Sequence, residues 1–135
     1  MRGISLLLIG AALASCATAP EPPARSAAKQ LEYERLLAGK VAGAPQSCLA
    51  TYHQNDMVVI DESTVAFRQG SNRVYVNHMQ GGCSNLGGNY ALVTKQFGSA
   101  QLCRGDIAQV VDLTNKFTVG SCVFGDFIPY ARPRA

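Results

Sequence analysis

The sequence QLCRGDIAQVVDLTNKFTVGSC, residues 101–122, contains the pattern that decides the fold. A cysteine is followed by a polar turn at 104–106, a strand-like run, a second turn at 114–115, and another strand-like run that ends in Cys122. Short runs rich in β-branched residues, separated by glycine, asparagine and aspartate, are typical of strands joined by tight turns. This stretch therefore predicts two strands of a small β domain whose cysteines are paired.

The same composition extends over residues 41–135, where no 3.6-residue periodicity is visible. We expect strands at 47–53, 56–61, 64–68, 74–78, 90–95, 107–113 and 117–124. The turn at 69–72 predicts a hairpin between the third and fourth of these, with one buried face. Val110 and Val111 interrupt the alternation of their strand, which indicates a bulge or a strand covered on both faces. The fold class is mainly β, as a small antiparallel barrel or sandwich.

The β domain contains four cysteines, at 48, 83, 103 and 122. An even number in an exported chain indicates disulfides, and four cysteines allow three pairings. Our hypothesis is Cys83 with Cys103 and Cys48 with Cys122, because the second bridge would tie the first strand to the last. Zinc or thioredoxin-like redox sites need closely spaced cysteines, and these cysteines are 35, 20 and 19 positions apart.

The first residues, MRGISLLLIGAALASC, indicate an export signal. Their apolar run is too short for a permanent membrane span. The segment LASC at 13–16 resembles the lipobox of bacterial lipoproteins. This resemblance implies cleavage of residues 1–15, a diacylglycerol thioether on Cys16, and a fatty acyl chain such as palmitate on the new amino terminus. Ala17 favours the outer membrane over the inner one. The alternative is an ordinary secretory signal with an unrelated cysteine.

Residues 16–40 form the second expected segment, which contains the lipidated cysteine, a linker and a short helix. Three of the six prolines lie at 20, 22 and 23, and they favour an extended spacer. Ser26 is a candidate N-cap, and Gly39 a candidate helix end. A partial apolar stripe indicates a helix that either packs against the domain or frays, with binding of a partner as a further alternative; the stripe consists of Leu31, Tyr33, Leu36 and Leu37.

The globular part contains a series of short motifs in this order: GK at 39–40, Cys48, VID at 59–61, Cys83, QLCRGDI at 101–107, GSC at 120–122 and FIPY at 127–130. In these motifs the chain resembles a family of short exported proteobacterial proteins, often lipoproteins, classed as a domain of unknown function. The LCRGDI run is the most specific of them. The chain departs from the family at 78–82, HMQGG, where we expect a more acidic or proline-containing loop. The resemblance implies export and the β fold, without an activity.

Candidate sites are few. Arg104, Gly105 and Asp106 spell an adhesion tripeptide, and we interpret them as a surface turn in which Gly105 has a positive φ and Asp106 caps the backbone. A copper site is conceivable from His53, Met57, His78 and Met79, although they show no repeated spacing. The sequence shows no catalytic nucleophile motif, and we predict no cofactor and no metal.

The formal net charge is +3, and from residue 41 onward 7 basic residues face 6 acidic ones. This balance gives no electrostatic footprint for nucleic acid. We expect a non-enzymatic binding or structural module on the periplasmic side of the outer membrane, with the membrane and an envelope protein as its contacts. The alternatives are an inhibitor of a secreted hydrolase such as lysozyme, and a periplasmic carrier of a small ligand or copper.

Overall fold

A computed structural model describes residues 24–96 and 100–134. The predicted signal peptide, Cys16 and the proline-rich linker lie outside these residues. Within these described residues, one α-helix, a short 3-10 helix and ten strands follow in chain order: α1 (Ala27–Leu37), β1 (Val41–Ala42), β2 (Cys48–Ala50), η1 (Thr51–His53), β3 (Met57–Asp61), β4 (Thr64–Gln69), β5 (Arg73–His78), β6 (Tyr90–Thr94), β7 (Gln101–Cys103), β8 (Ile107–Asp112), β9 (Thr118–Val123) and β10 (Phe127–Ala131). The expected mainly β fold with antiparallel strands and a short N-terminal helix is confirmed.

The strands form three antiparallel sheets. The largest has five strands in the order β1-β10-β5-β4-β3, a second pairs β2 with β7, and a third has the order β6-β8-β9. Isolated bridges join Gln46 to Phe127 and Gln80 to Val123. The predicted hairpin between β4 and β5 is present, and the predicted irregularity in β8 is a register shift between Val110 and Val111.

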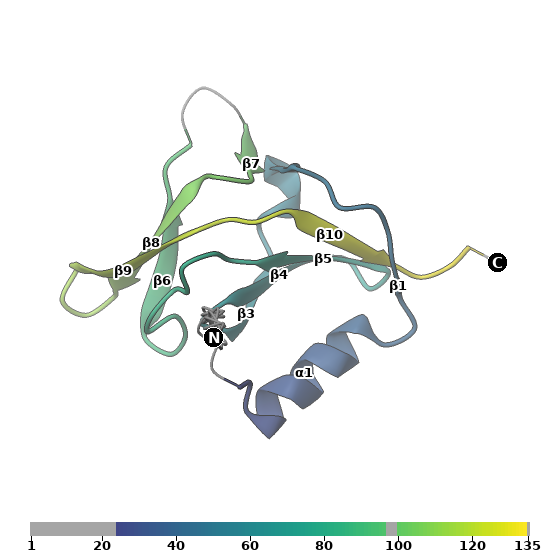
Figure 1. Cartoon of the computed structure of the whole chain (residues 1–135), viewed down its shortest axis with the longest axis horizontal. Coiled ribbons are helices and arrows are strands. Elements are labelled where there is room, and N and C mark those ends of the chain that lie inside the picture. The colour runs from purple at the N-terminus through teal and green to yellow at the C-terminus, as the bar shows by residue number, and fades with distance from the viewer. Residues whose placement is uncertain (1–23, 97–99, 135) are drawn as a thin grey trace, which may run out of the picture.

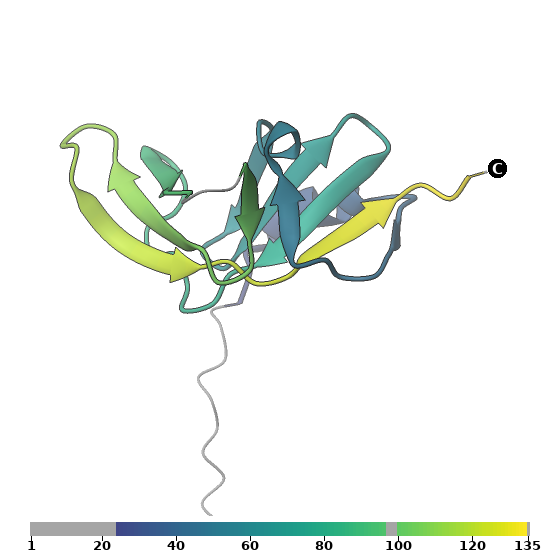
Figure 2. The same ribbon diagram turned by 90° about the horizontal axis from the view of Figure 1, so that it is seen from above.

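The five-stranded sheet is the middle layer of the molecule (Figure 1). Alternate residues of β4 and β5 point to opposite faces, so Ala66 and Val76 face α1 while Val65 and Phe67 face the smaller sheets. Both faces of these central strands are therefore buried, whereas the sequence indicated one buried face. In the view from above, the β8–β9 hairpin lies at one end and β10 runs toward the other (Figure 2).

The main core lies between the five-stranded sheet and the two smaller ones. Its buried side chains come from all three sheets and from the loop before β6; they are Leu49, Val65, Phe67, Tyr75, Met79, Cys83, Leu86, Leu102, Ala108, Val110, Cys122, Phe124 and Phe127. The stacked rings of Phe124 and Phe127, 5.9 Å apart, stand on either side of the crossover from β9 to β10. The crossover thus joins two sheets through the centre of the core.

Helix α1 begins and ends where the sequence predicts. The Ser26 hydroxyl accepts a hydrogen bond from the Lys29 amide at 3.3 Å, and Gly39 follows the helix with a φ of 71°. The stripe packs on the sheet through Tyr33, Leu36 and Leu37, while Leu31 is 47% exposed. Of the alternatives for this stripe, the structure shows packing against the domain.

The strand β10 was missed because it contains Pro129, which cannot donate to a ladder. The Pro129 carbonyl accepts a hydrogen bond of 2.7 Å from the Gly43 amide, beyond the end of the two-residue β1. Since the nitrogen and carbonyl of one strand residue point to the same side, the proline nitrogen also faces β1 and not β5. The β5 ladder therefore loses no hydrogen bond.

Two disulfides are present, but the predicted pairing is wrong. The structure joins Cys48 to Cys103 and Cys83 to Cys122, not Cys83 to Cys103 and Cys48 to Cys122. Cys48 and Cys103 are directly opposite each other in the β2–β7 pair, with Cα atoms 4.0 Å apart. The hypothesis assumed that the strand at Cys48 meets the last cysteine-bearing strand, and it failed because β7 was not recognised as a strand.

Gly125 occupies a position with no room for a side chain. A Cβ atom there would lie 2.5 Å from the His78 carbonyl oxygen, which belongs to the end of β5. We expect Gly125→Ala to lower the free energy of unfolding by about 2 kcal/mol, because backbone must shift. Urea denaturation measures this change. Gly43→Ala is the control: its Cβ would meet the Pro129 ring at 3.2 Å, a movable group, so an equal loss in both variants would contradict the steric argument.

Candidate functional site: a cleft beside the start of the helix

A cleft of about 940 Å³ lies between three segments of the chain. One wall is the start of α1, a second is the end of β3 with the turn into β4, and the third is the loop that leads into β6. The lining residues are Ala24, Arg25, Ser26, Lys29, Val59, Ile60, Asp61, Glu62, Ser63, Met79, Gly81, Gly82, Leu86, Gly87, Gly88 and Tyr90. This volume is at the upper end of the range for small-molecule sites.

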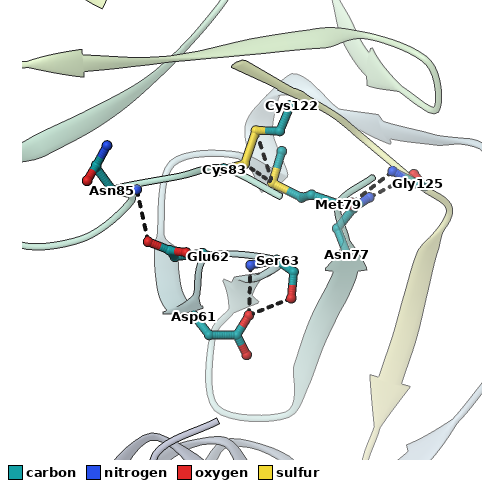
Figure 3. The surroundings of a disulfide bond; sticks show 9 residues. All are labelled: Asp61, Glu62, Ser63, Asn77, Met79, Cys83, Asn85, Cys122 and Gly125. Atoms are coloured by element: carbon teal, nitrogen blue, oxygen red, sulfur yellow. Dashed lines mark hydrogen bonds between the residues drawn. A yellow bond between two sulfur atoms is a disulfide. The ribbon is translucent and has the colours of Figure 1, made fainter. Parts of the chain in front are cut away.

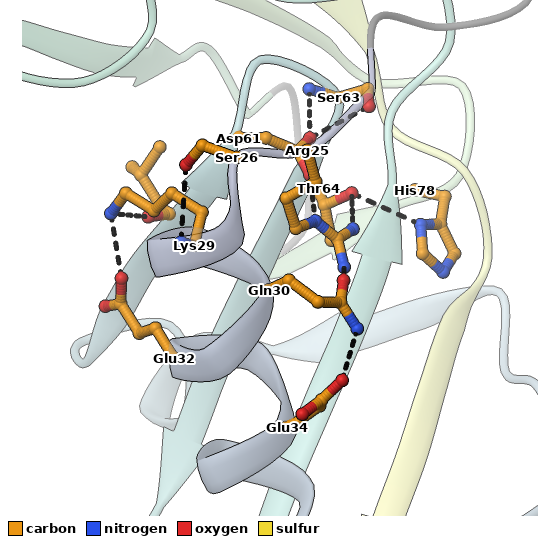
Figure 4. Close-up of polar contacts among 11 residues, drawn as sticks. Arg25, Ser26, Lys29, Gln30, Glu32, Glu34, Asp61, Ser63, Thr64 and His78 are labelled. Atoms are coloured by element: carbon orange, nitrogen blue, oxygen red, sulfur yellow. Dashed lines mark hydrogen bonds and ion pairs between the residues drawn. The ribbon is translucent and has the colours of Figure 1, made fainter.

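Arg25 holds the start of α1 against the β3–β4 turn (Figure 4). Its guanidinium donates to Asp61 at 2.6 Å, to Gln30 at 3.1 Å and to Thr64 at 3.1 Å, and lies 4.3 Å from the centre of the Tyr33 ring. Arg25 and Asp61 side chains are 19% and 22% exposed. The helical wall of the cleft is therefore fixed by several contacts of one partly buried side chain.

The carboxylate of Asp61 is fully engaged. Its second oxygen accepts from the Ser63 amide at 2.8 Å and from the Ser63 hydroxyl at 2.9 Å. Burial would raise the pKa of Asp61, but the hydrogen bonds from Arg25 and Ser63 outweigh it and lower that pKa. Asp61 therefore stays ionised near neutral pH and holds Arg25 in place through their ion pair.

The loop that forms the third wall is tied to the turn and to the core (Figure 3). The Glu62 carbonyl accepts from the Cys83 amide at 2.5 Å, and the Glu62 carboxylate accepts from the Asn85 amide at 3.0 Å. Cys83 is bonded to Cys122 of β9, and the Met79 sulfur lies 3.3 Å from the Cys83 sulfur. The disulfide thus fixes the loop that carries this wall.

Four glycines contribute main chain without side chains to the rim of the cleft. Gly81, Gly82, Gly87 and Gly88 line it, and a Cβ atom on any of them would meet no atom within 4 Å. Below the rim lie the apolar side chains of Met79 and Leu86, which are 5% and 7% exposed. The cleft combines an apolar floor, exposed main chain, and charged groups at one end.

The sequence did not identify this cleft. Arg25 directly follows the proline-rich linker, and glycine pairs such as those at 81–82 and 87–88 are typical of ordinary turns. One signal could have located it. The connection from β5 to β6, residues 79–89, is longer than an ordinary hairpin loop, and long loops often form binding sites.

The candidate turn at Arg104, Gly105 and Asp106 has the predicted form. Gly105 has a φ of 92°, and Asp106 accepts from the Cys103 amide at 2.7 Å. Arg104 is exposed but forms an ion pair with Asp126 at 3.2 Å. The turn also forms two main-chain hydrogen bonds with Phe124. The Phe124 carbonyl accepts from the Gly105 amide, and the Phe124 amide donates to the main-chain carbonyl of Asp106. These contacts are those of a structural turn.

The four residues considered for copper do not converge. His53 lies beside Gln69 at the end of β4, whereas His78 is paired with Thr64 at its beginning. Thr64 and Gln69 are five positions apart along β4, or about 17 Å. Met79 is buried against the disulfide. Within residues 24–96 and 100–134, no group of three or more His, Cys, Asp or Glu side chains is placed to hold a metal ion.

No protein-family model matches this chain. Searches among curated proteins and among solved structures also give no match. The family resemblance of the sequence motifs therefore remains a prediction. The described part of the chain also contains no helix long and apolar enough to cross a membrane.

The free energy of unfolding should fall on mild acidification because of His78, which lies beside the hydrogen-bond network of Arg25, Asp61 and Thr64. His78 is exposed at the end of β5, with Nδ1 3.5 Å from the Thr64 hydroxyl; partial desolvation of its ring, and then the Arg25 charge, lower the pKa of His78 below 6.5. The unfolded chain therefore takes up a proton first, so stability is lost as pH falls below about 6.5. The contribution of Asp61 is lost only below about 3.8, which separates the two effects.

The measurement is urea denaturation of the wild type and His78→Gln between pH 7.5 and 5. We expect a smaller loss of stability in the variant. Some dependence should remain, since burial also lowers the pKa of His53. An equal pH dependence in both proteins would show that His78 is not responsible.

Proposed function

We propose that this protein is a non-enzymatic binding module of the bacterial cell envelope, tethered by a lipid on Cys16 to the periplasmic face of the outer membrane. The observation that carries this proposal is the cleft. Its walls are held by the Arg25–Asp61 ion pair at 2.6 Å and by the Cys83–Cys122 disulfide. A surface fixed in this way loses little conformational entropy when a partner binds. The partner is an envelope protein.

The position of the tether supports the same proposal. Ala24 lines the cleft, and it lies eight positions after Cys16 in the sequence. Even fully extended, this segment spans at most about 28 Å. A lipid on Cys16 would therefore keep the cleft close to the membrane surface, where membrane-associated proteins are concentrated. The two disulfides suit the oxidising compartment that this location implies.

Photo-crosslinking in living cells tests the binding surface. We would place p-benzoyl-phenylalanine at Tyr90, which lines the cleft, and at Phe117, which is 54% exposed in the turn between β8 and β9. Both replacements exchange one aromatic residue for another. We expect a discrete adduct with one envelope protein from position 90 and none from position 117. The same adducts from both positions, or none from either, would contradict the proposal.

The tether has an independent test. Mass spectrometry of the N-terminal peptide should find a triacylated Cys16, and Cys16→Ser should release the protein from washed membranes. A Cys16→Ser protein that stays with the membranes as firmly as the wild type would contradict lipid anchoring and leave the cleft experiment to stand by itself.

A further inference from the structure

In the described part of the chain, two sheet edges that no strand pairs with border the cleft. β3 is the last strand of the five-stranded sheet, and β6 is the last strand of the three-stranded sheet. Val59 of β3 and Tyr90 of β6 both line the cleft, and both pack against the main core. The cleft therefore lies where the edges of two different sheets approach the same space.

The main chain of Val59 points away from β4 and toward the open edge. The Asp56 carbonyl accepts from the Arg68 amide at 2.8 Å, so residue 56 faces β4, and alternation along the strand turns Val59 outward. A separate contact agrees: the Lys29 ammonium donates to the Val59 carbonyl at 3.3 Å from the helix side. Among the described residues no strand pairs with this edge.

The main chain of Tyr90 points outward in the same sense. The Leu113 amide donates to the Asn89 carbonyl at 3.1 Å, which places residue 89 toward β8. The register continues with Tyr90 opposite Asp112, so alternation turns the Tyr90 amide and carbonyl away from β8. The cleft is thus bordered by an outward-facing donor and acceptor on each of two edges.

We infer that the cleft binds an extended segment of a partner polypeptide, which adds as a strand to β3 and β6. An extended chain alone presents donors and acceptors alternately on its two sides, as two flanking edges require. Every second side chain of the segment faces the floor formed by Met79 and Leu86, so these positions are apolar. The glycine rim lets the partner main chain approach closely.

This inference rests on the proposed function and specifies the chemistry of its partner. Lys29 acts as a displaceable cap on the edge. Its ammonium also pairs with Glu32 at 2.9 Å, and both side chains are almost half exposed, at 46% and 45%. When a partner amide replaces it at the Val59 carbonyl, Lys29 keeps its ion pair, so its displacement costs little.

The test begins with a phage-displayed library of random linear dodecapeptides, panned against the full-length protein in mild detergent with its disulfides intact. We expect enriched peptides with apolar residues at alternate positions. Synthetic copies, N-methylated at two central amides, should bind at least about tenfold more weakly because two main-chain donors are lost. Copies N-methylated at the terminal residues should bind within about twofold of the parent.

Protein variants provide the second readout. Lys29→Ala removes the cap, so the same peptides should bind about two- to fivefold more tightly, a gain that damage to the fold would not produce. Lys95→Ala removes an exposed lysine that does not line this cleft and should leave binding unchanged.

Three results would overturn the inference: no enriched peptide, peptides insensitive to central N-methylation, or equal affinities for the wild type and Lys29→Ala. Sedimentation of the protein adds a fourth: self-association that the parent peptides abolish and the centrally N-methylated copies do not would make a second copy of this chain the occupant. A crosslink from position 90 without any strand-like peptide would retain the binding module and reject only the strand.

Discussion

Replacing Cys83 and Cys122 together by alanine is expected to lower the free energy of unfolding by at least about 4 kcal/mol. The bridge closes a loop with a sequence separation of 39 residues, and the chain-entropy model gives about 4 kcal/mol for a loop of this length. The two side chains are also 0% and 3% exposed, so their removal takes buried contacts from the main core. Urea denaturation measures the loss.

The matched control is the other disulfide. Cys48 and Cys103 enclose a longer separation, 55 residues, for which the entropy model gives a slightly larger value, again about 4 kcal/mol. Both of these cysteines are only half-buried, so their removal costs fewer core contacts. We expect the Cys83–Cys122 variant to be the less stable of the two. The reverse order would mean that loop entropy outweighs core packing in this protein.

A non-reducing peptide map checks the pairing directly. It should yield one peptide pair that contains Cys48 and Cys103 and a second that contains Cys83 and Cys122. Any other pairing would contradict the structure, and free thiols at two or more of these positions would reopen metal or redox chemistry.

The sequence predicted most strands because their information is local. β3, β4, β5, β6, β8 and β9 are all short runs of β-branched or aromatic residues between turn signals. The three missed strands lack such a signal. β1 has two residues, β7 has three, and β10 contains Pro129; each is a strand only because a neighbouring chain pairs with it.

The candidate site could not be predicted from the sequence, because it too depends on contacts between residues that are far apart in the chain. The Arg25–Asp61 ion pair joins residues 36 positions apart, and nothing in the local pattern of either residue indicates the other. The disulfide pairing depended on β7, which was missed. In contrast, the turn at Arg104, Gly105 and Asp106 was predicted correctly, since its contacts to Cys103 are made within three residues.

The Asn77 side chain joins β5 to the crossover between β9 and β10, and replacing it by leucine should be severely destabilising. The side chain is 0% exposed. Its amide donates to the Gly125 carbonyl at 2.8 Å, and its oxygen accepts from the Gly125 amide at 3.0 Å (Figure 3). The same amide donates to the Asp126 carbonyl at 3.3 Å. Asn77→Leu leaves these groups unpaired in the interior, and we expect a loss of about 3 kcal/mol.

The position of these hydrogen bonds explains why their loss should lower the stability of the whole domain. Gly125 and Asp126 form the crossover from β9 to β10, and β9 and β10 belong to different sheets. Urea denaturation measures the total cost, and hydrogen exchange should show faster exchange at the Gly125 amide. Asn72→Ala, at an exposed position in the β4–β5 turn, is the control and should change stability by less than about 0.5 kcal/mol. If Asn77→Leu costs no more than this control, the crossover is held by the packing of Phe124 and Phe127 alone, and the hydrogen bonds of Asn77 add no net stability.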